Sequence, residues 1–117
     1  MIEKMLPTLL VVAAVLVVGY FMFMKGDDIS SAEARQLVQA GARLVDVRTP
    51  GEFAAGHIAG AINIPVQQLD ARVSELQPKD AAVVVYCRSG HRSGNAARML
   101  KSAGFVAVHD LGPMSRW

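Results

Sequence analysis

The clearest candidate for chemistry is the single cysteine of the chain, Cys87, which opens the run CRSGHR at residues 87–92. Nearby cationic side chains lower the pKa of a thiol, and the thiolate is its nucleophilic form. Backbone N–H groups in a tight loop before a helix also bind anions. Free cysteine is most often inert and buried, but two arginines, a histidine and a glycine after Cys87 favour a reactive thiolate.

The elements on either side of this run predict how the cysteine is positioned. Residues 81–86 form a continuous apolar and β-branched run, which is typical of a central strand buried on both faces of a parallel sheet. Gly90 gives the following loop conformational freedom. A helix expected over residues 93–103 would direct its positive end at the sulfur.

The rest of the domain alternates between helical and strand patterns. Ser30 and Glu33 form a capping-box pattern that opens a helix ending near Gly41. Further helices are expected at residues 52–55 and 66–76, and further strands at residues 44–47, 61–64 and 106–108. This order predicts an α/β fold with a largely parallel sheet and a site at the carboxyl ends of the strands.

Two segments together resemble the signatures of the rhodanese sulfurtransferases. CRSGHRS is similar to their active-site loop, and DVRTPGEFAAGHIAGAINIP, at residues 46–65, is similar to their upstream signature. The resemblance covers residues 29–117 and implies a five-stranded parallel sheet flanked by helices. It also implies that Cys87 carries sulfur as a persulfide, from a donor such as thiosulfate to cyanide or a thiol, without a metal or organic cofactor.

The resemblance also implies roles for the residues around the cysteine. The loop residues would bind the persulfide and the donor anion, with Arg92 also closing the loop; they are Arg88, Ser89, Gly90, His91 and Arg92. Four upstream residues would support the site structurally: Asp46, Arg48, Glu52 and His57. Among these, Glu52 is expected to engage Arg48, and His57 to hold the turn at residues 56–58. Gly112-Pro113 departs from the two glycines that many relatives have there.

Two other functions compete with sulfur transfer. A thiolate within a ring of N–H groups also suits a phosphatase or arsenate reductase, but those loops have five residues between cysteine and arginine, whereas Cys87 and Arg92 are separated by four. A rhodanese-like fold could instead serve as a membrane-tethered binding or regulatory module. A replaced cysteine would indicate that role, and here the cysteine is present.

The amino-terminal segment predicts a membrane anchor. Residues 5–24 contain no charge and would form a helix about 30 Å long, which matches the hydrocarbon core of a bilayer. A cleaved signal peptide normally ends in small residues, whereas this run ends in bulky ones. We expect a single-pass inner-membrane protein. Lys4 and the acidic pair Asp27 and Asp28 favour a domain on the periplasmic side.

Composition excludes several other classes of protein. The 117 residues allow one domain beyond the anchor, residues 29–117, and the mean hydropathy of +0.31 reflects the apolar amino-terminal run. A single cysteine excludes disulfide frameworks and cysteine-rich zinc sites. The basic residues are scattered along a chain of net charge +2, so no nucleic-acid partner is expected.

Overall fold

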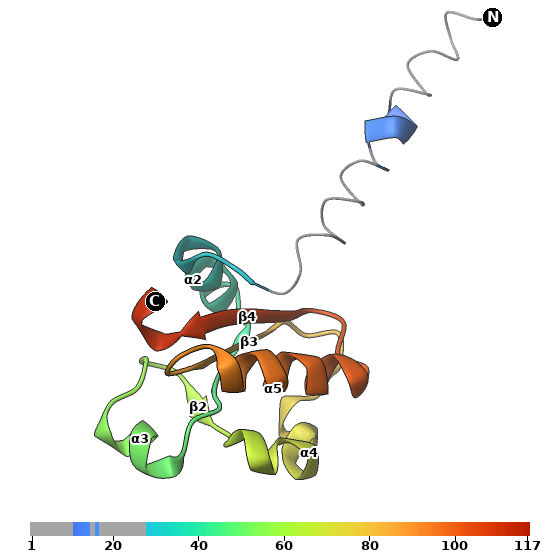
Figure 1. The fold of residues 1–117 in the computed structure, drawn as a ribbon. Helices are drawn as coiled ribbons and strands as arrows, with labels where there is room; N and C mark the ends of the chain where they lie inside the picture. Colours follow the sequence, from blue (N-terminus) through green and yellow to red (C-terminus); the bar gives the residue numbers. More distant parts are fainter. Residues whose placement is uncertain (1–10, 15, 17–27) are drawn as a thin grey trace, which may run out of the picture.

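The computed structural model describes residues 11–14, 16 and 28–117 (Figure 1). Most of the predicted membrane segment, residues 5–24, therefore lies outside the described residues. Residues 11–14 and Leu16 are helical, and Val11, Val12 and Leu16 are exposed. Within the described ranges, no helix combines the length and the apolar character needed to cross a membrane.

A four-stranded sheet forms the centre of the domain, with every neighbouring pair of strands parallel. Its spatial order is β2-β1-β3-β4, and the strands are β1 (Arg43–Asp46), β2 (Ile62–Asn63), β3 (Val83–Cys87) and β4 (Val108–Pro113). The register pairs Asp46 with Tyr86 and Cys87 with Pro113. The carboxyl ends of the three longer strands therefore meet at one edge, as predicted for the site.

The expected fifth strand is absent from residues 28–117. At the outer edge of β4, Asp28 forms an isolated parallel bridge with Asp110, and the Ile29 N–H donates to the Asp110 carbonyl at 3.1 Å. The bridge is parallel, as a fifth strand at this edge would be, but one bridged residue pair does not make a strand. The prediction of five strands is therefore corrected to four in this part of the chain.

The helices connect the strands and vary in length. They are α2 (Ser31–Gln39), α3 (Pro50–Ala55), η1 (Val66–Gln68), α4 (Leu69–Arg72), η2 (Val73–Leu76), α5 (His91–Ser102) and η3 (Met114–Arg116), where η marks a 3₁₀ helix. The single helix predicted at residues 66–76 is thus three short pieces. Its apolar spacing from Val66 to Leu69 and from Val73 to Leu76 is three residues, which suits a 3₁₀ turn.

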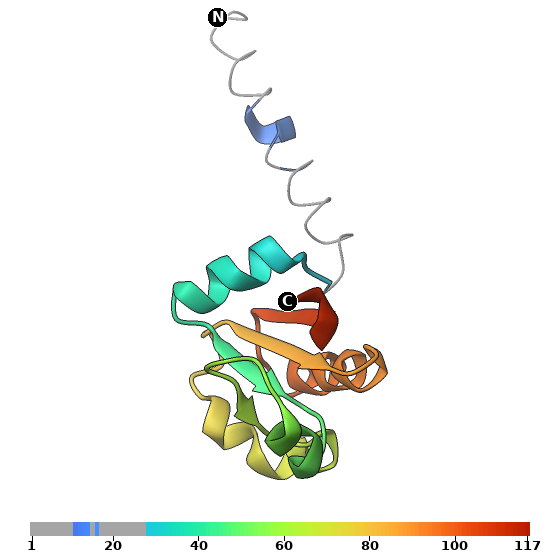
Figure 2. The ribbon, with the colours of Figure 1, turned by 90° about the vertical axis from the view of Figure 1, so that its left-hand side faces the viewer.

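Helices cover both faces of the sheet (Figure 1, Figure 2). Side chains along a strand alternate between faces, so Val83, Val85 and Cys87 join a core with residues of α4, η2 and α5. Val84 and Tyr86 join a second core, which includes Ala34 of α2. The sulfur of Cys87 therefore lies on the face covered by α5, at the carboxyl edge of the sheet.

Candidate active site

The cysteine loop, residues 87–92, makes a tight turn from β3 into α5. The strand ends at Cys87, and α5 begins at His91, two residues earlier than the sequence pattern predicted. Gly90 precedes the helix with a φ of 99°, a left-handed conformation that favours glycine over any other residue. The turn directs backbone N–H groups of the first helical turn toward the sulfur.

The Cys87 sulfur is fully buried and surrounded by hydrogen-bonding groups. The N–H groups of Gly90 and Ser93 donate to Sγ at 3.0 Å and 3.4 Å. The thiol can donate to Ser93 Oγ at 3.5 Å, while that hydroxyl donates to the Gly90 carbonyl at 3.1 Å. In the thiolate, the same hydroxyl can turn its proton toward the sulfur.

These hydrogen bonds favour the ionised form of Cys87. Burial alone would raise the pKa of the thiol, because the interior disfavours charge. The Ser93 hydroxyl and the N–H groups of Ser93, Gly90 and Ser89 outweigh burial, and the net pKa of Cys87 is lowered. Neutral hydrogen-bond donors are therefore the main groups that hold the thiolate. The sequence predicted N–H donors in the loop together with arginine charge.

Ser93 contacts the sulfur, although it was not among the site residues that the sequence predicted. It was assigned only as the first residue of the helix, whereas the structure places it buried in the first turn of α5, with both its N–H and its hydroxyl at the sulfur. The available signal was the final serine of CRSGHRS, which lies six residues after Cys87. Ser89, Arg88 and His91 have exposed side chains.

Arg92 connects the start of α5 to α3. Its two terminal nitrogens donate to the two carboxylate oxygens of Glu52 at 2.7 Å and 3.0 Å. The Arg92 hydrogen bond is the largest cause that lowers the pKa of Glu52 to about 2, and the ion pair raises the pKa of Arg92 in turn. Glu52 therefore forms its ion pair with Arg92, whereas its expected interaction with Arg48 is limited to a charge effect that helps to raise the pKa of Arg48.

Asp46 and Arg48 form a buried ion pair at the carboxyl end of β1, where Asp46 pairs with Tyr86 of β3. Arg48 Nη2 lies 2.6 Å from Asp46 Oδ2, and the Arg48 backbone N–H donates to Oδ1 at 2.9 Å. Arg48 Nη2 also donates to the Gly56 carbonyl at 2.7 Å, which fixes the end of α3. Tyr86 lies under Arg48, with its ring centroid 5.8 Å from the guanidinium carbon. The pair thus holds the ends of β1 and α3 together.

His57 lies in the turn that follows α3. Its Nδ1 is 2.9 Å from the Phe53 carbonyl oxygen, and its ring stacks on Phe53 with the ring centroids 3.7 Å apart. These contacts close the carboxyl end of α3, and the side chain is exposed. The structure therefore gives His57 contacts within α3 and its turn and none with the cysteine loop.

A hollow of about 300 Å³ borders the cysteine loop at the carboxyl edge of the sheet. Its wall combines the end of α3, one loop residue and the start of η3, and consists of Arg48, Glu52, Ala55, Gly56, Arg88 and Met114. We refer to it as the Arg88 hollow. Arg88 is the only residue of the cysteine loop among these lining residues, and Cys87 itself does not line the hollow.

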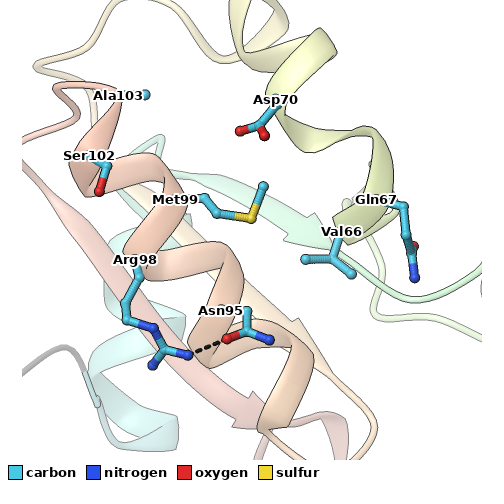
Figure 3. Close-up of a pocket in the computed structure, with 8 residues that line it drawn as sticks. All are labelled: Val66, Gln67, Asp70, Asn95, Arg98, Met99, Ser102 and Ala103. Carbon is cyan, nitrogen blue, oxygen red and sulfur yellow. Dashed lines mark hydrogen bonds between the residues drawn. The ribbon is translucent and has the colours of Figure 1, made fainter.

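A larger hollow of about 690 Å³ lies elsewhere, between α5 on one side and η1 and α4 on the other (Figure 3). Val66 and Met99 face each other across it, and Arg98 donates to the side-chain oxygen of Asn95 at its rim. Its lining contains no cysteine, histidine or serine hydroxyl paired with a base. Size alone therefore does not identify the reactive centre of this domain.

No cluster of three or more histidine, cysteine, aspartate or glutamate side chains that could hold a metal ion occurs in residues 28–117 or in the short described amino-terminal part. The groups that interact with one another at this site are the Cys87 thiol, its hydrogen-bond donors in Gly90 and Ser93, and Arg92, whose charge acts on the sulfur. This arrangement suits nucleophilic chemistry at sulfur with an anionic reactant.

Comparison with known proteins agrees with this geometry. The sequence-family model named rhodanese-like domain matches residues 30–117 of this chain. The uncharacterized protein YqhL of Bacillus subtilis is 44% identical over 77 residues, which are 65% of this chain and 60% of YqhL. A protein of Allochromatium vinosum named sulfurtransferase is 45% identical over 75 residues, 63% of this chain and 69% of its own length. The human single-domain sulfurtransferase TSTD1 superposes with a TM-score of 0.66 at 29% identity, covering 79% of this chain and 92% of that one.

Proposed function

Because the chain belongs to the rhodanese-like domain family, we propose that it is a sulfurtransferase that carries sulfane sulfur on Cys87. The observation that carries this proposal is the Cys87 thiol, whose pKa is lowered by a ring of neutral hydrogen-bond donors at the carboxyl edge of the sheet. Relatives named sulfurtransferases support the general class of activity. Thiosulfate as donor, and a thiol or cyanide as acceptor, are the finer part of the proposal.

The proposed reaction consists of two displacements at sulfur. The Cys87 thiolate attacks the outer sulfur of thiosulfate, a new S–S bond forms, and the old S–S bond breaks so that sulfite leaves with the electron pair. The acceptor thiolate or cyanide then attacks the terminal sulfur of the persulfide, and Cys87 leaves as a thiolate. Two displacements replace one difficult transfer, and the N–H groups of Gly90 and Ser93 stabilise the negative sulfur.

The loop is better suited to sulfur than to phosphate. A phosphatase or arsenate reductase must surround a tetrahedral oxyanion, whereas here the N–H groups of Gly90 and Ser93 already lie 3.0 Å and 3.4 Å from Sγ. The Cys87 sulfur is fully buried, and only four residues separate it from Arg92. A single additional sulfur atom requires less space than a phosphoryl group. A binding module without activity remains the contrasting outcome of the test below.

The direct test is the Cys87→Ser variant of the full chain. Serine is close in size but is not ionised at neutral pH, so we expect the fold to persist and sulfur transfer from thiosulfate to cyanide to be lost. Mass spectrometry of the wild type after thiosulfate treatment should show one added sulfur on Cys87 and none on the variant. Transfer by the serine variant would disprove the nucleophile, and an inactive wild type with an unmodified Cys87 would favour the binding module.

We also propose that residues 5–24 anchor the protein in the inner membrane, with the domain on the periplasmic side. The support is the uncharged run of 20 residues and its match to a bilayer. Protease added to intact spheroplasts should remove the domain if it is periplasmic. Digestion only after the membrane is broken would place it in the cytoplasm.

A further inference from the structure

The carboxyl end of β4 lies next to the residue that carries the reactive sulfur. The register of β3 and β4 shifts by one residue after Val85, where β4 contains an extra residue, Leu111. This shift places Pro113, the last residue of β4, opposite Cys87. Paired strands lie about 4.8 Å apart, so the backbone of Pro113 is a direct neighbour of the backbone of Cys87.

Pro113 also lies beside the cysteine loop at Gly90. A Cβ atom built on Gly90 would lie 3.7 Å from Pro113 Cδ and 3.9 Å from Gly112 Cα, which are ordinary van der Waals distances. The proline ring therefore limits the space into which Gly90 could move toward β4. Gly90 matters to the chemistry because its N–H donates to Cys87 Sγ at 3.0 Å, a shorter hydrogen bond than the one from the Ser93 N–H at 3.4 Å.

Gly90 needs contacts of this kind because it has no side chain to hold it. Its φ of 99° is left-handed, and glycine loses more conformational freedom on folding than any other residue. The Gly90 carbonyl accepts from the Ser93 hydroxyl and from the Gly94 N–H, both at 3.1 Å, and these bonds fix one end of the residue. A ring on the neighbouring strand supplies the steric limit that a packed side chain would otherwise give.

The end of β4 is itself held in place, so it can impose that limit. The Gly112 N–H donates to Asp110 Oδ1 at 2.8 Å, and Arg116 Nη1 donates to the Leu111 carbonyl at 3.1 Å. Pro113 has a φ of −68°, within the narrow range that its ring imposes. A glycine at this position, as in many relatives, would have neither the ring nor the fixed φ.

We propose that Pro113 is a positioning residue: its ring holds Gly90 in the conformation that directs the Gly90 N–H at the sulfur of Cys87. In the proposed reaction the sulfur is negative as the attacking thiolate and again as the departing thiolate, so a donor held in place serves both displacements. This inference rests on the proposed function and deepens it, because it assigns the orientation of a loop donor to a residue outside the loop.

The test measures the pH dependence of iodoacetamide alkylation in the full chain. Cys87 is the only cysteine, so alkylation reports on this site alone. The Gly90 N–H helps to lower the pKa of Cys87, so Pro113→Gly should raise the midpoint by about half a pH unit, or about threefold less thiolate below the midpoint, as expected for one weakened neutral hydrogen bond. The rate at high pH, where the thiol is fully ionised, reports separately on access to the sulfur.

Pro113→Ala separates the ring from the stiffness of the chain. Alanine removes the ring but allows the backbone far less freedom than glycine does. If the ring holds Gly90, the midpoint should rise in this variant as well. A shift in Pro113→Gly without a shift in Pro113→Ala would overturn the proposal, because chain stiffness rather than the ring would then be responsible. An unchanged midpoint in both variants would also overturn it.

The matched control is Ser115→Gly, which loosens η3 two residues beyond Pro113 and leaves the ring in place. The Ser115 side chain is exposed, so its removal disturbs no packed contact. Its alkylation midpoint should equal that of the wild type. A rise as large as that of Pro113→Gly would indicate general loosening at the end of β4 and would contradict a specific role for the ring.

Sulfur transfer gives an independent second measurement. In an active protein, Pro113→Gly should lower kcat/KM for thiosulfate about threefold near neutral pH and approach the wild type at alkaline pH, where both proteins are ionised. Raised midpoints in a protein that transfers no sulfur would keep the role of Pro113 and reject the enzyme. Transfer by the wild type with unchanged midpoints in the variants would keep the enzyme and reject the role of Pro113.

Discussion

At the scale of single residues, the Ser93 hydroxyl can form a hydrogen bond with the sulfur of Cys87 in either ionisation state of the thiol. Ser93 Oγ lies 3.5 Å from Cys87 Sγ and 3.1 Å from the Gly90 carbonyl. With a protonated thiol, the hydroxyl donates to the carbonyl and accepts from the sulfur. After ionisation it can donate to the sulfur instead. The only rearrangement that this new hydrogen bond requires is a rotation of the Ser93 O–H bond. Pre-oriented donors of this kind stabilise developing charge at little reorganisation cost.

This arrangement predicts the effect of Ser93→Ala on the acidity of Cys87. The variant removes a hydrogen bond that lowers the pKa of the thiol but keeps the Ser93 backbone N–H. The pKa of Cys87 should therefore rise, and the pH dependence of iodoacetamide alkylation should move to higher pH. Sulfur transfer near neutral pH should fall because less thiolate is present.

Ser89→Ala is the matched control for that experiment. The Ser89 side chain is exposed, and its contribution to the pKa of Cys87 comes from its backbone N–H, which alanine retains. Its alkylation profile should coincide with that of the wild type. Equal shifts in the two variants would indicate a general loosening of the loop and would contradict a specific role for the Ser93 hydroxyl.

The sequence predicted Cys87 as the nucleophile, with loop N–H groups and arginine charge at its sulfur, but it did not predict the contribution of the Ser93 hydroxyl. Cys87 stood out because of the residue types that follow it, whereas three of the four donors that lower its pKa are backbone N–H groups, which every residue except proline possesses. The pairing of Glu52 was missed for a similar reason. Glu52 is four residues from Arg48 and forty from Arg92, so proximity in the sequence favoured the wrong partner.

At the scale of elements, the Glu52–Arg92 ion pair connects α3 and α5, two helices that are far apart in the sequence. Glu52 lies in the first turn of α3, where the Thr49 hydroxyl accepts from its backbone N–H in a capping box. Arg92 lies in the first turn of α5, next to the cysteine loop. The amino-terminal ends of both helices therefore meet beside the sulfur, and the ion pair sets their separation.

Glu52→Gln tests this connection through the dependence of stability on pH. The pKa of Glu52 is lowered in the folded protein to about 2, mainly by Arg92, so its ionised form stabilises the fold above the ordinary pKa near 4.5. At pH 7 the variant should melt a few degrees below the wild type. The difference should shrink as the pH falls from about 4.5 toward about 2, because the wild-type carboxyl then also becomes neutral.

Glu75→Gln provides the comparison for the same measurement. Glu75 pairs with Arg72 only three residues away, and exposed pairs within one helical segment contribute little. Its melting temperature at pH 7 should be closer to that of the wild type. If the two variants lost equal stability, the Glu52–Arg92 pair would be an ordinary surface ion pair without a role in joining α3 to α5.

Most elements lie near their predicted positions, and the clearest differences are in β4 and in the helical region at residues 66–76. β3 and α5 appear near their expected positions because a buried β-branched run and a helical apolar face are local signals. β4 was expected at residues 106–108 but occupies Val108–Pro113, where histidine, aspartate, glycine and proline conceal it. Its register also shifts opposite Val85 and Tyr86, and this irregularity depends on pairing with β3 that no local pattern reveals.

At the scale of the whole molecule, the amino-terminal boundary of the domain is set by packing. Ile29 is 7% exposed and belongs to the core on the α2 face, and its N–H donates to Asp110 of β4 at 3.1 Å. Asp28 bridges to the same residue. Among the described residues, packing into the domain therefore reaches back to residues 28–30, and the contacts of these residues are part of its fold.

A chain of residues 28–117 should accordingly fold and retain full sulfur transfer, since it keeps Ile29 and all the residues around Cys87. A chain of residues 31–117 should be less stable. It loses the burial of Ile29, about 1.5–3 kcal/mol, and the Ser30 cap of α2, about 1 kcal/mol. Urea unfolding of the two chains measures this difference, and equal stability would show that residues 28–30 lie outside the cooperative unit.

The same pair of chains tests the proposed membrane anchor. Residues 5–24 are uncharged and apolar, so the full chain should sediment with membranes and require detergent, while residues 28–117 should remain in the supernatant with unchanged kcat/KM. The matched control is a full chain with Leu10→Arg and Val17→Asp, because two charges within the apolar run oppose insertion. It should leave the membrane fraction and stay active. Retention of that variant on membranes would reject the spanning segment, and loss of activity in residues 28–117 would mean that the amino-terminal segment contributes to the site.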